Sequence, residues 1–334
     1  MGAGGEEDSH VEGRLTGDID RTLLGVPIRL ICRTLEEREA VRAASAHWQG
    51  ETDPTAQALT IGLQSCAGLD RNSPLQFDVS GSQMVLRGRG IDGLANSAQR
   101  SARCALSPDW FERAADLLTL VLEPLALFLA TQNGRAPIHS SGIKVRQTAI
   151  LFAGPSGAGK SSLAMAAHRA GLTVLSEDTV YVRLQPELAI WGWNGPIHLL
   201  PGEAPPAAPI RIRNGRAKHA VALENATANT EPAKSAVVCI LKHAAQPSLT
   251  PLSTRAALDL LGPLEPGFDL LAPAVHAAHR QLCKRGAWLL GLSRSPGEAI
   301  ALVLENLDRL REARTERGVE TVIPIPGFGA QTSC

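Results

Sequence analysis

The stretch that most limits how this chain can fold is FAGPSGAGKSSLA at positions 152–164, where three glycines and a proline crowd between an apolar run and an alanine-rich segment. From Gly154 to Ser161 it fits the pattern G-x-x-x-x-G-K-[ST]. Glycine has no Cβ and tolerates positive φ, so the main chain can curl until several N–H groups converge on one point. The apolar run 149–153 predicts a buried strand before the loop, and KSSLAMAAHRAG predicts a helix after it. The pattern therefore predicts an α/β domain with a cradle for phosphate groups.

The residue types in the loop indicate what it binds. Lys160 can place its ammonium group on the outer phosphates, and the Ser161 hydroxyl is a ligand of the kind that Mg²⁺ takes. The helix N-terminus adds amide groups and the positive end of its dipole. An ordinary glycine-rich turn is the weaker interpretation, because the spacing, the Lys-Ser pair and the flanking elements all agree. We expect ATP and Mg²⁺ as cofactors, held by Gly154, Pro155, Ser156, Gly157, Ala158, Gly159, Lys160, Ser161 and Ser162.

Two adjacent carboxylates, Glu177 and Asp178, interrupt the next apolar segment, LTVLSEDTVYV at 172–182. One carboxylate can hold the metal ion, and the other can accept a proton from an attacking hydroxyl group. We expect Ser161 and Asp178 to hold the metal, and Glu177, or Asp178 in its place, to act as the base. The alternative is a polar turn in which both side chains are merely solvated.

The segment IHSSGIKVRQTAILFAGPSGAGKSSLAMAAHRAGLTVLSEDTVYV, residues 138–182, resembles the C-terminal catalytic domain of HPr kinase/phosphorylase. That enzyme phosphorylates a serine of a carrier protein and belongs to a P-loop lineage shared with phosphoenolpyruvate carboxykinase. The family pattern puts a histidine ahead of the P-loop strand and an acidic pair at the end of the next strand; here these are His139 and Glu177-Asp178. The resemblance is strongest to relatives in peptide-modification gene clusters, where the protein target is not HPr.

The resemblance implies a serine kinase that uses ATP and Mg²⁺, with Lys160, Glu177 and Asp178 as catalytic residues and His139 supporting the base. Its acceptor is then a serine of a protein or peptide. The family has Asp-Asp where this chain has Glu177-Asp178, which weakens the case for reverse, phosphate-removing chemistry and leaves the identity of the base open. Two alternatives stay open: a small-molecule kinase acting on free serine or a sugar, and a nucleotide-binding regulator that transfers nothing.

The chain is expected to contain two folded parts. The prediction is a disordered tail at 1–20, an N-terminal α+β accessory domain at 21–133, an α/β P-loop catalytic domain at 134–315 and an extended tail at 316–334. The catalytic domain should have a mixed sheet with flanking helices, similar to HPr kinase and phosphoenolpyruvate carboxykinase. The accessory domain either recognises the acceptor or mediates homo-oligomer formation. The apolar run 117–130 should be a helix kinked before Pro124.

Two further features of the second domain bear on substrate binding. A predicted hairpin turns at Asn214-Gly215, and it is unusually basic; its cations either bind an anion or are simply solvated. Core or loop packing is the favoured interpretation of Trp191 and Trp193. The basic residues of the hairpin are Arg211, Arg213, Arg216, Lys218 and His219.

Bulk composition excludes some classes of partner. Lys and Arg total 33, as do Asp and Glu, so the zero formal net charge argues against a nucleic-acid or membrane-surface protein. The six cysteines show no metal-site spacing and are expected to be free thiols in a reducing compartment. With Glu123 and Pro124 interrupting the longest apolar run and no signal-peptide pattern at the N-terminus, we expect a cytoplasmic protein.

Overall fold

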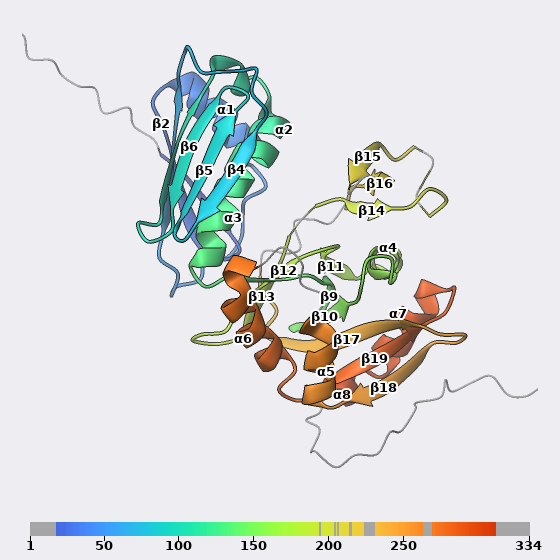
Figure 1. The fold of residues 1–334 in the computed structure, drawn as a ribbon. Coiled ribbons are helices and arrows are strands. Elements are labelled where there is room, and N and C mark those ends of the chain that lie inside the picture. The colour runs from blue at the N-terminus through green and yellow to red at the C-terminus, as the bar shows by residue number, and fades with distance from the viewer. Residues whose placement is uncertain are drawn as a thin grey trace, which may run out of the picture. The chain divides into compact units, whose positions relative to one another are not determined.

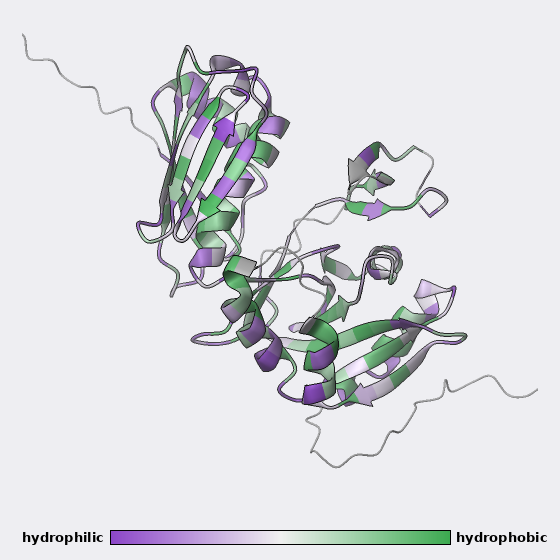
Figure 2. Cartoon of the chain, viewed as in Figure 1, coloured by the Kyte–Doolittle hydropathy of each residue, from purple (hydrophilic) through white to green (hydrophobic). Residues whose placement is uncertain are grey.

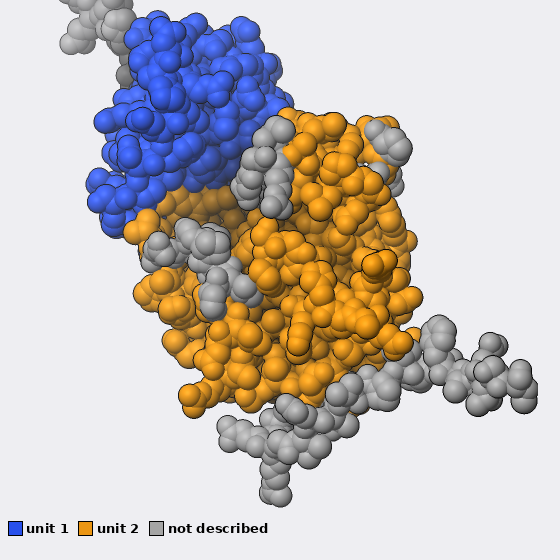
Figure 3. All heavy atoms as spheres, turned by 45° about the vertical axis from the view of Figure 1, so that its right-hand side comes forward, with its two compact units in different colours: residues 1–21, 28–46, 58–126 blue, residues 22–27, 47–57, 127–334 orange. Residues whose placement is uncertain are grey.

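The computed structural model describes residues 18–193, 195–203, 205, 207–213, 216–223, 231–262 and 269–311. Most of the expected tail at 1–20, the whole expected tail at 316–334 and the turn at Asn214-Gly215 lie outside these ranges. The chain divides into two compact units (Figure 3). Unit 1 comprises residues 1–21, 28–46 and 58–126, and unit 2 comprises residues 22–27, 47–57 and 127–334.

Unit 1 is built on a seven-stranded sheet in the order β1-β2-β3-β7-β6-β5-β4 (Figure 1). Strands β2, β3 and β7 run parallel, and the hairpins from β7 to β4 are antiparallel. Alternate residues of β3 are buried, as expected for a sheet with one face on a core. The strands are β1 (Ile19–Leu23), β2 (Val26–Cys32), β3 (Leu59–Ser65), β4 (Gln76–Ser80), β5 (Gln83–Gly88), β6 (Ile91–Asn96) and β7 (Ser101–Leu106).

Helix α1 (Leu35–Ala44) begins with a capping box at Thr34 and Glu37. The Glu37 carboxylate is buried and accepts hydrogen bonds from the main-chain N–H groups of Arg33 at 2.7 Å, Thr34 at 3.0 Å and Ser65 at 2.6 Å. A buried carboxylate is stable only when such donors satisfy it. One side chain therefore starts the helix and ties it to the end of β3.

A long helical segment runs from Ala114 to Gln132 and continues through the expected kink site. It consists of α2 (Ala114–Leu117), a widened π turn at Leu118–Leu122 and α3 (Glu123–Gln132), after a short 3₁₀ turn at Pro108–Trp110. Pro124 has no N–H for the carbonyl four residues earlier, which explains the wider turn before it. By length and composition alone the segment could cross a membrane, but its wholly buried Leu117, Val121 and Leu125 are typical of a core helix.

Unit 2 contains a mixed six-stranded sheet in the order β11-β9-β10-β17-β19-β18. Strands β10, β17 and β19 are parallel, and β9 and β18 run antiparallel to their neighbours. All six residues of β10 are buried, which confirms the strand expected at 149–153. The strands are β9 (Ser141–Val145), β10 (Thr148–Ala153), β11 (Thr173–Ser176), β17 (Ser235–His243), β18 (Ser248–Leu252) and β19 (Ala287–Leu292).

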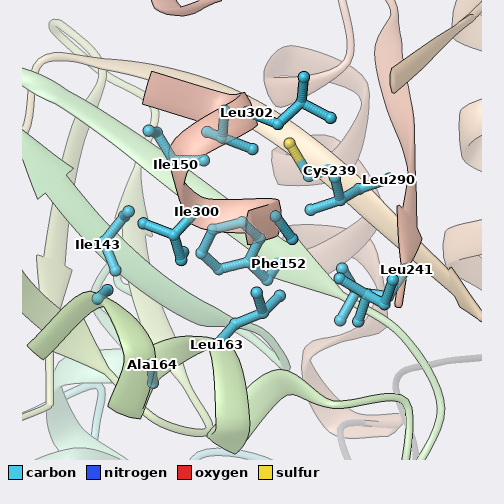
Figure 4. Packing of buried hydrophobic residues seen from close by; sticks show 14 of the residues in the cluster. Ile143, Ile150, Phe152, Leu163, Ala164, Cys239, Leu241, Leu290, Ile300 and Leu302 are labelled. Atoms are coloured by element: carbon cyan, nitrogen blue, oxygen red, sulfur yellow. The ribbon is translucent and has the colours of Figure 1, made fainter. Parts of the chain in front are cut away.

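Each face of this sheet has its own hydrophobic core. Ile150 and Phe152 of β10 point to one face, where they pack with residues of α4 (Lys160–Arg169) and α7 (Pro296–Glu305) (Figure 4). Leu151 points to the other face, with α5 (Thr254–Leu261) and α6 (Ala272–Leu282). A 3₁₀ turn at Asp269–Leu271 precedes α6, and α8 (Leu307–Arg311) follows α7. Figure 2 shows β17 as mainly hydrophobic, in keeping with a strand covered on both faces.

Two three-stranded sheets complete unit 2, in the orders β13-β12-β8 and β14-β16-β15. The protein is thus a mixed α/β protein with several mixed or antiparallel sheets. The five cysteines in the described ranges are free thiols. The strands of the small sheets are β8 (Ala136–Ile138), β12 (Val180–Arg183), β13 (Ala189–Gly192), β14 (Ile197–Leu199), β15 (Ile210–Arg213) and β16 (Arg216–Val221).

A buried ionic network joins distant segments of unit 2 around Asp53. The Arg135 guanidinium donates to Asp53 Oδ2 at 2.8 Å and to the carbonyl of Leu24 at 2.8 Å, and Arg183 pairs with the same carboxylate. Thr55 donates to Asp53 Oδ1 through its N–H and its hydroxyl group. Burial alone raises the pKa of Asp53, but these hydrogen bonds and the charge of Arg183 outweigh it and lower the pKa to about 2.

We predict that Asp53→Asn lowers the free energy of unfolding at pH 7 by about 2 kcal/mol or more, because the buried Arg135 and the partly buried Arg183 lose their counter-charge. A carboxyl group with a lowered native pKa stabilises the fold above its unfolded pKa of about 3.9, and this stabilisation is lost between about pH 4 and pH 2. The difference between wild type and variant should therefore shrink over that range, measured by urea unfolding followed by tryptophan fluorescence.

Asp308→Asn is the matched control, because the Asp308 side chain is 93% exposed. It should change the stability by less than about 0.5 kcal/mol. Equal stability losses for the two variants at pH 7 would contradict the assigned role of Asp53.

Candidate active site

The loop between β10 and α4 has the backbone that its glycines were expected to allow. Gly157 and Gly159 have φ values of 85° and 99°, in the left-handed region that favours glycine. A Cβ on Gly154 would lie 2.9 Å from the Ala158 Cβ and 3.2 Å from the Leu241 Cβ. Both flanking elements predicted from the sequence, a buried strand and a helix that begins at Lys160, are present.

Lys160 follows the loop, and its ammonium group folds back onto the first residues of that loop. Its Nζ donates to the carbonyl of Gly154 at 2.6 Å and of Pro155 at 3.2 Å, and the residue is only 8% exposed. The buried Ser141 hydroxyl donates to the Lys160 carbonyl at 3.3 Å and so ties β9 to the start of α4. The positive charge is thus held on two main-chain carbonyl groups at the start of the loop.

The hydroxyl group of Ser161 points to the first residue of the acidic pair. Ser161 Oγ donates to Glu177 Oε1 at 2.6 Å, and His198 Nδ1 lies 3.2 Å from Glu177 Oε2. Glu177 is 8% exposed, so its carboxylate sits between the loop helix and strand β14 rather than in solvent. This excludes the interpretation of Glu177 as a solvated turn residue.

Asp178 points to a different partner. Its Oδ1 lies 3.6 Å from His139 Nδ1, and its side chain is 39% exposed. The Ser176 hydroxyl accepts hydrogen bonds from the N–H groups of Asp178 at 3.3 Å and Thr179 at 3.2 Å, which fixes the turn that separates the two carboxylates. Two residues adjacent in sequence therefore have separate surroundings, one enclosed and one open.

Sheet topology explains why these groups meet. Strands β10 and β11 both pair antiparallel with β9, so their carboxyl ends lie at one edge of the sheet, where β9 begins. The loop follows β10, the acidic pair follows β11, and His139 precedes β9. Every catalytic residue expected from the sequence is thus brought to this edge.

His198 was not singled out from the sequence. His198 lies in β14 between Ile197 and Leu199, which are almost completely buried. The sequence signal that could have marked it as a site residue was a polar residue between two core residues. Glu203, in turn, contacts helix α4. Its Oε2 accepts a hydrogen bond from Ser162 Oγ at 3.2 Å, and its main-chain carbonyl accepts one from Arg169 at 3.3 Å.

The packing interpretation of the two tryptophans is confirmed for Trp191. Its buried ring has the guanidinium groups of Arg135 and Arg183 at 4.6 and 5.6 Å from its centroid. The Trp193 ring meets the Tyr181 ring edge-on at 6.2 Å. In the described ranges no three His, Cys, Asp or Glu side chains converge into a metal cluster. A Mg²⁺ ion held by one or two protein oxygens and by phosphates needs no such cluster.

Comparisons with known proteins add little to this geometry. No protein-family model matches the sequence, and no curated protein matches it. Among solved structures, the HPr(Ser) kinase/phosphatase from Coxiella burnetii is similar, with 12% sequence identity, over 53% of this chain and 98% of that chain. The TM-score of 0.25 is too low for this similarity to carry an argument about function.

We predict that Gly192→Ala destabilises unit 2 by about 2 kcal/mol or more, because a Cβ at this position of β13 would overlap the Leu175 carbonyl oxygen. Leu175 is two residues before Glu177, so the close approach of β13 also positions the site. The measurement is chemical denaturation. Gly297→Ala, where a Cβ meets no atom within 4 Å, should be neutral or up to about 1 kcal/mol stabilising. An unchanged Gly192→Ala protein would contradict the packing described.

Proposed function

We propose that this protein is an ATP- and Mg²⁺-dependent P-loop kinase that transfers the γ-phosphate to a hydroxyl group, the serine of a protein or peptide. The single observation that carries the proposal is the contact between Ser161 of the G-x-x-x-x-G-K-S loop and the enclosed Glu177 carboxylate. A loop hydroxyl joined to a carboxylate from a neighbouring strand is the arrangement with which P-loop enzymes hold magnesium nucleotides. The choice of a serine acceptor rests on the sequence resemblance.

Phosphate binding falls to the loop and to Lys160. The glycine backbone offers N–H groups, and the Lys160 ammonium group, now bound to two carbonyl oxygens of the loop, can exchange them for phosphate oxygens. This exchange stays within hydrogen-bond reach, because Gly154 and Pro155 are part of the cradle itself. The enclosed position of the ammonium group strengthens its attraction to a polyphosphate.

The donor set fits magnesium. Ser161 and Glu177 offer hard oxygen atoms 2.6 Å apart, and His198 holds the far oxygen of the carboxylate. When bound, Mg²⁺ neutralises charge on the β- and γ-phosphates. We place Glu177 on the metal side of the site together with Ser161, because Ser161 Oγ donates to Glu177 Oε1. This proposal differs from the expectation drawn from the sequence, in which Ser161 and Asp178 hold the metal.

The more exposed carboxylate suits the base. We assign proton acceptance to Asp178, with His139 orienting it. In the proposed step the acceptor oxygen forms a bond to the γ-phosphorus and its proton passes to Asp178. The bond from the γ-phosphorus to the bridging oxygen breaks, and its electron pair leaves with ADP. Positioning and charge stabilisation supply most of the rate.

We predict that Lys160→Ala weakens magnesium-ATP binding and lowers phosphate transfer about 100-fold or more, because the outer phosphates lose their cation. Isothermal titration calorimetry measures the binding, and transfer is followed from γ-labelled ATP to serine peptides and to free serine or sugars. Label that appears only on a small molecule would replace the protein kinase with a small-molecule kinase. Tight binding with neither transfer nor hydrolysis would make the protein a regulator.

Replacing Glu177 and replacing Asp178 should change different kinetic quantities. We predict that Glu177→Gln raises the Mg²⁺ concentration for half-maximal activity about tenfold or more. Asp178→Asn should keep the Mg²⁺ requirement and magnesium-ATP affinity but lower kcat about 100-fold or more. Steady-state kinetics over a magnesium series separates the two. The reverse pattern would exchange the roles, and two fully active variants would remove the acidic pair from the mechanism.

A further inference from the structure

The three-stranded sheet β14-β16-β15 has two chemically different faces. Residues opposite each other in neighbouring strands share a face, as do residues two apart in one strand. On one face lie Ile197 and Leu199 of β14, which are buried in the core beside α4, together with Val221 of β16. This apolar face explains how the sheet is held on unit 2.

The opposite face is basic and begins at the active site. His198, which contacts Glu177, lies opposite Ala220 of β16, and Lys218 is two residues from Ala220 on the same face. Lys218 in turn lies opposite Arg211 of β15. A row of basic positions on this face therefore extends from His198, which contacts Glu177, through Lys218 to Arg211 on the outer strand β15.

Fold stability does not account for this row. Like charges directly opposite in antiparallel strands are destabilising, and Arg211 and Lys218 form such a pair. Arg211 is exposed, and neither Arg211 nor Lys218 forms an ion pair with another residue that the structure describes. An anionic partner would relieve the repulsion, whereas a hairpin that only has to fold gains nothing from it.

We propose that this basic face of β14-β16-β15 binds an acidic segment of the phospho-acceptor, so that the acceptor is a serine flanked by carboxylates. The proposal rests on the proposed kinase function and names its substrate class. Neighbouring strands lie about 4.8 Å apart, so the Arg211 row is about 10 Å from β14. An extended chain covers about 3.3 Å per residue, which places the acidic residues about three to five positions from the serine.

Two features favour a peptide over nucleic acid. Strands β14, β15 and β16 contain no Phe, Tyr or Trp on which bases could stack. One exposed apolar side chain adjoins the basic row: Leu200, directly after β14, is 46% exposed. A cation next to an exposed aliphatic group matches a mixed acidic and apolar peptide segment.

The test measures binding without requiring transfer. A fluorescent serine peptide with glutamates three to five positions from the serine is compared with a glutamine copy by anisotropy. The wild type should bind the glutamate peptide about tenfold or more tightly than the copy, with strong salt dependence. Arg211→Glu combined with Lys218→Glu should abolish this preference and leave magnesium-ATP affinity unchanged.

Lys284→Glu combined with Arg285→Glu is the matched control, because both residues are exposed cations of unit 2 outside this sheet, and it should keep the preference. Arg211→Gln and Lys218→Gln, each alone, should show a partial loss, which guards against a misfolded double variant. Equal binding of both peptides, equal losses in the two double variants, or binding of a single-stranded oligonucleotide alone would overturn the acidic-acceptor proposal. Selective peptide binding without any phosphate transfer would contradict the kinase assignment but would support the basic face as a binding surface for acidic peptides.

Discussion

The rest of the site depends on the two contacts of the Glu177 carboxylate, with Ser161 and with His198. One of its oxygens accepts from the loop serine and the other lies beside His198, so a single side chain joins the helix after the loop, the end of β11 and the small sheet containing β14. Its enclosure strengthens both contacts, because a carboxylate away from water interacts more strongly with its partners. Without it, Ser161 and His198 would each lose the carboxylate that they contact.

The two adjacent carboxylates, Glu177 and Asp178, have different partners. In a regular strand, neighbouring residues point to opposite faces, and here the turn held by the Ser176 hydroxyl widens the separation further. Glu177 has the extra methylene that reaches the loop helix, while Asp178 stays open beside His139. In the proposed assignment, the longer side chain of Glu177 lies on the metal side and the shorter one of Asp178 faces the acceptor.

Local features were predictable from the sequence, and distant pairings were not. The strand, loop and helix at 149–169 follow from apolar runs, glycine conformational freedom and the Lys-Ser ending, all within about 20 residues. His198 could not be placed at Glu177, because the contact depends on how β14 packs on α4. The same holds for Asp53, whose partners Arg135 and Arg183 come from other segments of unit 2. Arg211 and Lys218 were visible in the sequence, but only the register showed that they stand opposite each other on the face that carries His198.

The most direct test of the account is a crystal structure with Mg²⁺ and a non-hydrolysable ATP analogue. The account predicts that the β- and γ-phosphates lie in the loop 154–159, that Lys160 Nζ has left the Gly154 carbonyl for phosphate oxygens, and that the metal ion lies beside Ser161 and Glu177. A structure in which Lys160 keeps its contact with the Gly154 carbonyl while the analogue binds elsewhere would contradict it.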